Sequence, residues 1–333
     1  IWAVLGIFIV YYLICLWRNK VSIWPLIIFI FFSGLDYIGV WILSQPAMNL
    51  NLAEHLEWWA VDFQYSSMTT QLFWVFNQSV PAWVVIAMIF VNSSNKKNML
   101  FLMGCIILTS TFPFVGLLPF VIYYLLKDFH LNSGYFRTIF SVQNIVGIFT
   151  VGLISVIYLL GNLSANSVGG DSVANTADTS ALVLKYILFY ILEFGVYAFF
   201  VYRDNKRNPI YYIVVIMLII CPFIKVGGAH DFCMRASIPS LFILMLMCIS
   251  SLERMFVEGK KYIYFAFIFV LGVGAITPFN EIHRSVRETI NLSTAGLEVT
   301  YPEWSIEEVL LSGANFSGDV ASGLFYNYFA RSK

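Results

Sequence analysis

Asp36 and Asp62 are the two carboxylates of this chain whose surroundings suit acid–base chemistry at a membrane surface. Asp36 lies inside a long apolar run, two residues after Gly34, and Asp62 lies in a polar and aromatic stretch that follows. A charged side chain at membrane depth costs at least ~2.5 kcal/mol, so it usually faces a cavity or a partner. Both residues are candidate catalytic bases that would remove a proton from a hydroxyl group. A structural hydrogen bond is the alternative role for Asp36.

Side chains that can bind a sugar or a lipid headgroup lie in the stretch 62–78. Gln64, Tyr65 and Gln78 are candidate substrate-binding residues, because amide and hydroxyl groups alternate there with aromatic rings. Rings with a polar edge also gather wherever a protein meets the headgroup layer. An aromatic belt is therefore the alternative, and the more general, interpretation of this stretch.

A second polar group, made of His230, Asp231 and Arg235, precedes the apolar run 238–252. An arginine can hold a phosphate through two parallel hydrogen bonds, and its charge survives partial burial. The three residues are therefore candidate substrate-binding residues, with Arg235 as the phosphate ligand. Asp231 and Arg235 are four residues apart, so an ion pair on one helix face is the alternative.

Glu193 is the other acidic residue inside an apolar run, and its mid-span position favours a structural hydrogen bond over catalysis. No metal and no cofactor is expected, because the acidic residues form no DxD pair and the five cysteines form no CxxC pair. The GxxxxGK[ST], HExxH and GxSxG motifs of other enzyme classes are also absent.

The composition indicates which kind of protein must position these residues. Of the 333 residues, 59% are apolar and 11% are charged, whereas soluble domains carry about 25% charged residues. A soluble protein is therefore excluded. The 19 basic and 19 acidic residues give no net charge, and the basic ones are scattered. Nucleic acid is not expected as a partner, because binding it needs a basic surface.

Apolar runs predict an all-α, polytopic membrane protein with about ten spans, since a spanning helix needs about 20 apolar residues. The stretch 99–126 is too long for one span and contains Pro113 and Pro119, which favours two short helices there. The expected spans are 1–17, 23–43, 80–91, 99–110, 112–126, 138–160, 181–202, 210–224, 238–252 and 262–277.

The distribution of basic residues predicts the orientation. The short linkers between alternate spans carry 12 of the 19 basic residues, and such linkers face the cytoplasm. This places the loop 45–79, with its amphipathic helices, on the outer side. We expect a transmembrane helical domain at 1–277, preceded by further spans upstream, and a small extracytoplasmic segment at 278–333.

Three stretches carry a resemblance: SGLD at 33–36, FQYSS at 63–67 with FWV at 73–75, and HDFCMRASIP at 230–239. They are similar to stretches of bacterial multispan envelope proteins, and the layout resembles polytopic glycosyltransferases of the GT-C class. The resemblance implies transfer of a sugar from a polyprenyl phosphate donor to an envelope glycan, lipid or protein acceptor. It also implies a bacterial plasma membrane protein in contact with membrane lipid. The catalytic acid of that class usually lies in the first outer loop of the whole protein, which the expected upstream spans would place before this sequence. Asp36 and Asp62 are therefore candidates by position only.

Two other classes of function fit the same residues. A secondary transporter of a polar or anionic solute would place Asp36, Glu193 and Arg235 in an internal cavity. Internal repeats, which many transporters have, are not evident in the sequence. A non-catalytic envelope assembly protein is the third interpretation. Convergence of the polar residues at the outer face would favour the transferase, and a midplane site open to both sides would favour the transporter.

Overall fold

The computed structural model describes residues 1–43, 55–60, 63–93, 96–127, 129, 133–166, 179–224, 231–294 and 324–329. Every regular element in these residues is a helix, which confirms the all-α prediction. The α-helices are α1 (Trp2–Arg18), α2 (Trp24–Phe31), α3 (Asp36–Leu43), α4 (Met68–Trp74), α5 (Phe76–Val91), α6 (Met99–Ile106), α7 (Thr111–Leu126), α8 (Ser133–Ile139), α9 (Val142–Val146), α10 (Leu153–Asn166), α11 (Thr179–Tyr190), α12 (Val196–Asn205), α13 (Pro209–Ile220), α14 (Asp231–Ala236), α15 (Ile238–Val257), α16 (Lys261–Gly274), α17 (Ile276–Thr294) and α19 (Leu324–Tyr328).

Short irregular helices connect several of these elements. Three have the 3₁₀ form and two have the wider π form. The 3₁₀ helices are η1 (Leu56–Ala60), η2 (Lys96–Asn98) and η5 (Cys221–Phe223), and the π-helical segments are η3 (Gly147–Gly152) and η4 (Ile191–Gly195).

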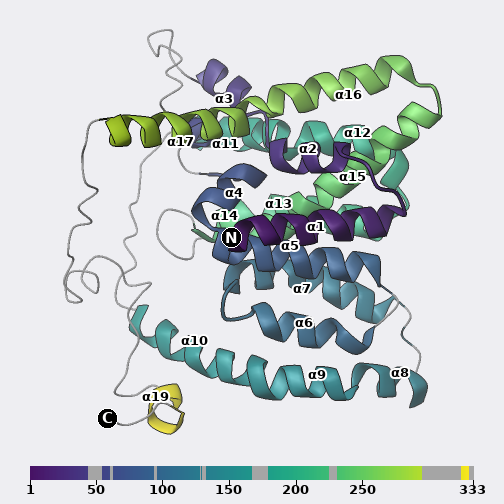
Figure 1. Ribbon diagram of the computed structural model, residues 1–333, viewed down its shortest axis with the longest axis vertical. Helices are drawn as coiled ribbons and strands as arrows, with labels where there is room; N and C mark the ends of the chain where they lie inside the picture. The colour runs from purple at the N-terminus through teal and green to yellow at the C-terminus, as the bar shows by residue number, and fades with distance from the viewer. Residues whose placement is uncertain are drawn as a thin grey trace.

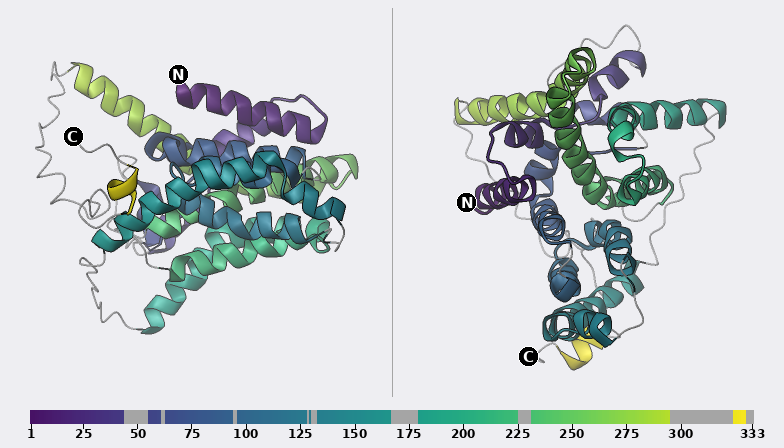
Figure 2. Two further views of the ribbon diagram at one scale, coloured as in Figure 1. Left: turned by 90° about the horizontal axis from the view of Figure 1, so that it is seen from below. Right: turned by 90° about the vertical axis from the view of Figure 1, so that its right-hand side faces the viewer.

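Helix α15 forms the centre of the bundle. Its sequence is apolar on every side over the first three turns, and nearly all of its side chains are buried, as expected for a helix that is surrounded by others. It packs against α2, α5, α7, α12, α13 and α16. The N-terminal helix α1 packs along α5, and α9 and η3 pack along α6 at the edge of the bundle, where α10 continues from η3 (Figures 1 and 2).

Five helical stretches are long and apolar enough to cross a membrane: Trp24–Leu43, Val142–Leu160, Val183–Asn205, Asp231–Val257 and Lys261–Thr294. Shorter apolar helices cover Trp2–Arg18, Phe76–Val91, Thr111–Leu126 and Pro209–Phe223. The stretch 99–126 is divided into α6 and α7, as its prolines predicted. The predicted domain boundary at 277/278 falls in the first turn of α17, which follows α16 directly.

The stretch Trp24–Leu43 is not one continuous helix, because the backbone is extended between α2 and α3. Phe32 has φ −79° and ψ 123°. Its carbonyl accepts a 3.0 Å hydrogen bond from the Met68 amide, and the Leu35 amide donates a 3.0 Å bond to the Leu192 carbonyl. At Gly34 a Cβ atom would lie 2.1 Å from Glu193 Oε2, so only glycine fits at this crossing. Neighbouring segments therefore satisfy the backbone groups that the break leaves free.

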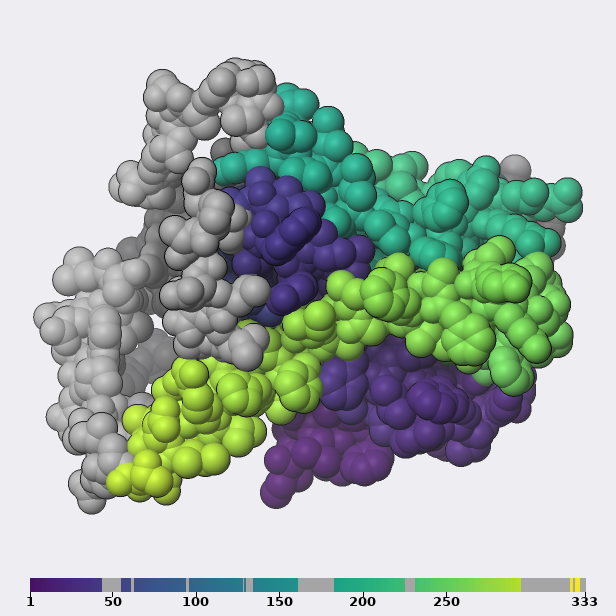
Figure 3. All heavy atoms as spheres, turned by 90° about the horizontal axis from the view of Figure 1, so that it is seen from above, coloured from purple at the N-terminus to yellow at the C-terminus, as the bar shows by residue number. Residues whose placement is uncertain are grey.

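The two ends of the bundle differ in charge. Arg18 pairs with Glu253, and Arg254 with Asp204 at 3.3 Å, where α1, α12 and α15 come together; we call this the basic end. Helix α14 lies at the start of α15, about 30 Å away at helical rise. In Figure 1 α3, α4, α14 and α17 gather there, and in Figure 3 α16 and α17 cross the surface as one green-to-yellow band beside the purple N-terminal helices. We call this second end the polar end.

Candidate functional site

Asp36 begins α3 at the break in the stretch Trp24–Leu43. Its side chain is 0% exposed, and the Ser33 hydroxyl donates a 2.8 Å hydrogen bond to its Oδ2. The Glu193 carboxyl lies beside that of Asp36. Asp36 Oδ1 and Glu193 Oε2 are buried and have no hydrogen-bond partner among the described residues. The acid that the sequence assigned to a structural hydrogen bond, Glu193, is thus the direct neighbour of the candidate base.

The position of Glu193 depends on the π-helical segment η4. One extra residue per turn shifts the side chains of this segment relative to a regular helix, and such segments are frequent at functional sites. The Trp59 indole donates a 2.9 Å hydrogen bond from Nε1 to Glu193 Oε1. Trp59 belongs to η1, in the segment between α3 and α4, so this segment covers the two carboxyls.

Glu57 brings a third carboxyl to the same place. Its Oε1 accepts a 2.9 Å hydrogen bond from the Ser67 amide, and its Oε2 accepts a 2.8 Å bond from Gln64 Nε2. Burial raises the pKa of Glu57, the nearby His55 opposes this shift, and the charge of Asp36 adds to it. Glu57 therefore both joins the carboxyl cluster and holds the start of α4 in place. We name Asp36, Glu57 and Glu193 the carboxyl cluster.

His55 extends the carboxyl cluster toward α17. Its Nδ1 lies 3.0 Å from Glu281 Oε2, and its Nε2 lies 3.6 Å from Glu57 Oε2. Burial alone would lower the pKa of His55, but the hydrogen bond to Glu281 and the charges of Glu57 and Glu281 outweigh it, so the pKa is raised. Glu281 also accepts hydrogen bonds from Trp74 Nε1 at 2.8 Å and from Arg284 Nη2 at 2.7 Å. A continuous chain of acidic and basic groups thus runs from α3 to α17.

The α14 turn lies next to the segment that follows η1. The Cys233 thiol donates a 3.6 Å hydrogen bond to the Gln64 carbonyl, and Arg235 Nη2 lies 3.1 Å from Asp231 Oδ1. The ion pair that the sequence offered as an alternative is therefore formed. The side chains of Arg235 and Asp231 are 26% and 13% exposed, so both keep access to solvent. Asp62 and His230 lie outside the described residues.

Tyr65 and Gln78 have structural contacts. The Tyr65 hydroxyl donates to the Leu218 carbonyl, and its ring lies 4.8 Å from that of Phe189 in the core. The Gln78 main-chain carbonyl accepts a 2.8 Å hydrogen bond from the Ser110 hydroxyl, whereas the buried side-chain Oε1 has no hydrogen-bond partner among the described residues. Of the predicted substrate-binding residues, the structure brings Gln64 next to the carboxyl cluster through Glu57, and it places Tyr65 in the protein interior.

Within the described residues, no three side chains of His, Cys, Asp or Glu are grouped so that they could hold a metal ion. No family model, curated protein or solved structure matches the chain.

Sequence reasoning did not select His55, Glu57 or Glu281 for chemistry. His55 and Glu57 fall in a stretch that resembles an interfacial helix, and Glu281 falls among the acidic residues of the predicted outer segment. His55 and Glu281 are 226 residues apart, so no local sequence pattern indicates that they are in contact. The one sequence feature that points to these residues is the position of His55 close to Trp58 and Trp59 in a short polar and aromatic stretch.

Proposed function

We propose that this protein is a membrane glycosyltransferase that moves a sugar from a polyprenyl phosphate donor to an envelope glycan, lipid or protein acceptor. One observation carries the proposal: Asp36, Glu57 and Glu193 come together from three elements at the polar end, under cover of η1. Carboxyl groups that are buried close together are suited to general acid–base catalysis at a hydroxyl group. Their position away from the basic end favours a reaction at the outer face.

The proposed reaction needs one base and one phosphate ligand. The acceptor hydroxyl loses its proton to the Asp36–Glu193 pair, and its oxygen attacks the anomeric carbon of the sugar. The bond from that carbon to the phosphate oxygen breaks, and the electron pair leaves on polyprenyl phosphate. Arg235, which is partly exposed beside the Gln64 segment, binds the phosphate. Asp62 remains a second proposed base.

Access to the carboxyl cluster is the main geometric requirement. Asp36 is fully buried, and Trp59 of η1 lies over Glu193. An acceptor therefore reaches the pair only when η1 moves away from α3. Because four of the five residues of η1, Leu56, Glu57, Trp59 and Ala60, are buried, such a movement must break their packing as well as the hydrogen bonds of Glu57 and Trp59.

The proposed topology follows the charge distribution. We propose about ten spans, with the basic end in the cytoplasm and the polar end and the segment 278–333 outside a bacterial plasma membrane. The ion pairs of Arg18 with Glu253 and of Arg254 with Asp204 support a common location of these linkers. In this arrangement the carboxyl cluster lies in the outer leaflet, where lipid-linked sugars are used.

A secondary transporter is the second candidate function, and the broken stretch Trp24–Leu43 favours it. Discontinuous helices form substrate and ion sites in many transporters, and the Asp36–Glu193 pair lies directly at the break. A proton bound by this pair would then be carried across the membrane together with a solute. The transferase is preferred because η1, a short helix outside the candidate membrane-spanning stretches, completes the polar cluster.

Proteoliposomes separate the two functions. The native protein is incubated with polyprenyl phosphates that carry labelled hexoses or pentoses, and both sugar release from the lipid and proton uptake into the vesicles are followed. The transferase predicts sugar release that Asp36→Asn stops and no proton flux. Solute-dependent proton flux that Asp36→Asn stops, without sugar release, would support the transporter and contradict the transferase.

A further inference from the structure

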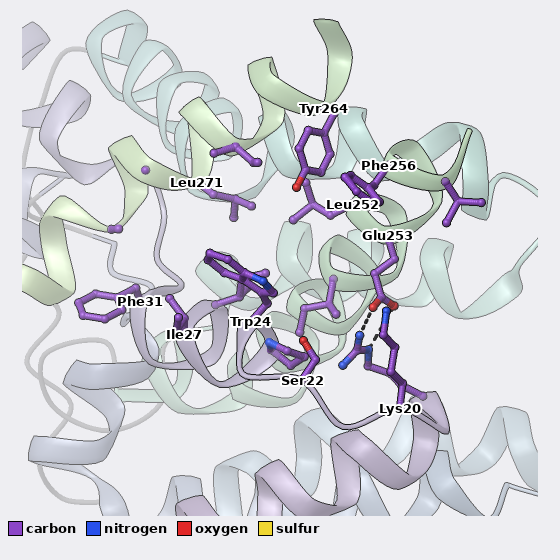
Figure 4. Close-up of a pocket in the computed structure, with 18 of the residues that line it drawn as sticks. Lys20, Ser22, Trp24, Ile27, Phe31, Leu252, Glu253, Phe256, Tyr264 and Leu271 are labelled. Carbon is purple, nitrogen blue, oxygen red and sulfur yellow. Dashed lines mark hydrogen bonds and ion pairs between the residues drawn. The ribbon is translucent and has the colours of Figure 1, made fainter. Parts of the chain in front are cut away.

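A large apolar groove lies away from the carboxyl cluster, between α2, α15 and α16 (Figure 4). Its volume is about 1130 Å³, above the range of about 300–1,000 Å³ that is typical of pockets for small molecules. The rim residues Trp24, Phe256 and Phe279 are each more than half exposed, so the groove opens on the outer surface of the bundle. The walls between them are almost entirely aliphatic and aromatic.

The polar groups of the groove are gathered at one end. Arg18, Lys20, Ser22 and Glu253 line it at the basic end, and Figure 4 shows Lys20, Ser22 and Glu253 close together there. Arg18 pairs with Glu253 and its side chain is 5% exposed. Its Nη1 atom has no hydrogen-bond partner among the described residues. Lys20 is exposed, so this end carries one positive charge beyond the Arg18–Glu253 pair.

The shape and charge of the groove together define its occupant. A long apolar hollow takes hydrocarbon chains, and a buried guanidinium with a free N–H beside an exposed ammonium takes an anionic headgroup. Basic pockets between membrane helices on the cytoplasmic side are typical sites for anionic lipid headgroups.

We propose that the groove binds an anionic glycerophospholipid of the inner leaflet. Its phosphate contacts Lys20 and the Ser22 hydroxyl beside the buried Arg18 guanidinium, and its acyl chains lie along α2, α15 and α16. The lipid fills the space that these helices leave open and fixes α2 against α16. Helix α2 leads directly into the break at Phe32, so the bound lipid supports the geometry of Asp36. The proposal rests on the proposed orientation of the basic end and not on the transferase.

Native mass spectrometry of the purified protein tests this proposal with added phosphatidylglycerol and, for comparison, phosphatidylcholine. We expect one tightly bound phosphatidylglycerol and little bound phosphatidylcholine. Lys20→Ala should weaken phosphatidylglycerol binding about fivefold, as expected for one basic residue at a membrane surface. Lys261→Ala is the matched control, because Lys261 lies at the same end but does not line the groove, and it should leave binding unchanged.

A second variant tests the groove itself. Gly272 lines it, and a Cβ atom there would meet nothing within 4 Å. Gly272→Phe should therefore fill the groove and abolish lipid binding while thermal unfolding stays close to that of the native protein. Equal binding of both lipids, unaffected by Lys20→Ala, would overturn the proposal. Tighter binding of polyprenyl phosphate than of phosphatidylglycerol, or a dimer that Gly272→Phe disrupts, would also overturn it in favour of another occupant.

Discussion

The Trp59 indole donates a 2.9 Å hydrogen bond to the carboxyl of Glu193, which lies inside a helical stretch long and apolar enough to cross a membrane. The bond joins η1 to the Asp36–Glu193 pair without adding a positive charge. Helix η1 therefore lies over the carboxyl cluster and is also hydrogen-bonded to it.

Trp59→Phe should destabilise the protein by about 1–3 kcal/mol, because the substitution leaves a buried carboxyl oxygen without its donor. The measurement is thermal unfolding in detergent. Trp58→Phe is the matched control, since Trp58 is the next residue and is 65% exposed. Equal effects of the two substitutions on thermal unfolding would show that the hydrogen bond to Glu193 contributes nothing to stability.

Gly34→Ala should also destabilise the fold, by about 1–3 kcal/mol, because the added methyl group would overlap neighbouring atoms. The new Cβ atom would lie 2.1 Å from Glu193 Oε2 and 3.0 Å from the Glu193 Cα atom. Gly272→Ala is the control, since it meets nothing within 4 Å. The free energies of unfolding of the two variants should therefore differ clearly, and a neutral Gly34→Ala would contradict the observed crossing.

The contact of His55 with Glu281 and Glu57 should depend on pH. The raised pKa of His55 means that its protonated form favours the folded state. This stabilisation is complete below about pH 6.5, the ordinary pKa of histidine, and is lost as the pH rises through the folded-state pKa. Arg284 also faces this group and opposes the shift.

His55→Gln tests this dependence through thermal unfolding measured across pH. The difference in Tm between the native protein and the variant should be largest near pH 6 and shrink toward pH 9, roughly the range around the histidine pKa. His283→Gln, at an exposed position of α17, should show no such trend. A difference that grows with pH would contradict the proposed charge on His55.

Arg235→Lys tests the phosphate ligand of the proposed transferase. Lysine keeps the positive charge but cannot form two parallel hydrogen bonds, so binding of polyprenyl phosphate should weaken about tenfold. Binding is measured by native mass spectrometry or by displacement of a labelled lipid. Arg287→Lys, in the exposed part of α17, is the control. An unchanged affinity of Arg235→Lys would remove Arg235 from the proposed site.

The sequence predicted those features that depend on local pattern. The apolar runs located most helices, the prolines located the division between α6 and α7, and Gly34 with Asp36 marked the exceptional point in the stretch Trp24–Leu43. An acidic residue and a glycine are unusual within an apolar stretch, whichever fold the chain adopts. These signals remain visible in a single sequence because each depends on a few neighbouring residues.

The composition of the carboxyl cluster could not be predicted in the same way. Trp59 meets Glu193 across 134 residues and His55 meets Glu281 across 226 residues. Neither pair has a local signature, because each contact depends on how η1 folds back over the bundle. The structural hydrogen bond expected for Glu193 is formed, but its donor, Trp59, could not be named from the sequence because it comes from outside the helix that contains Glu193.

The most direct test of the central claim is the initial rate of sugar transfer from a polyprenyl phosphate donor by Asp36→Asn, with donor binding measured in the same membranes. The account predicts a rate at least about 100-fold below that of the native protein, the usual contribution of a general base, and binding of the donor within about twofold. Asp204→Asn, at the basic end, should retain the native rate. A native rate of transfer by Asp36→Asn would contradict the assignment of the Asp36–Glu193 pair as the base.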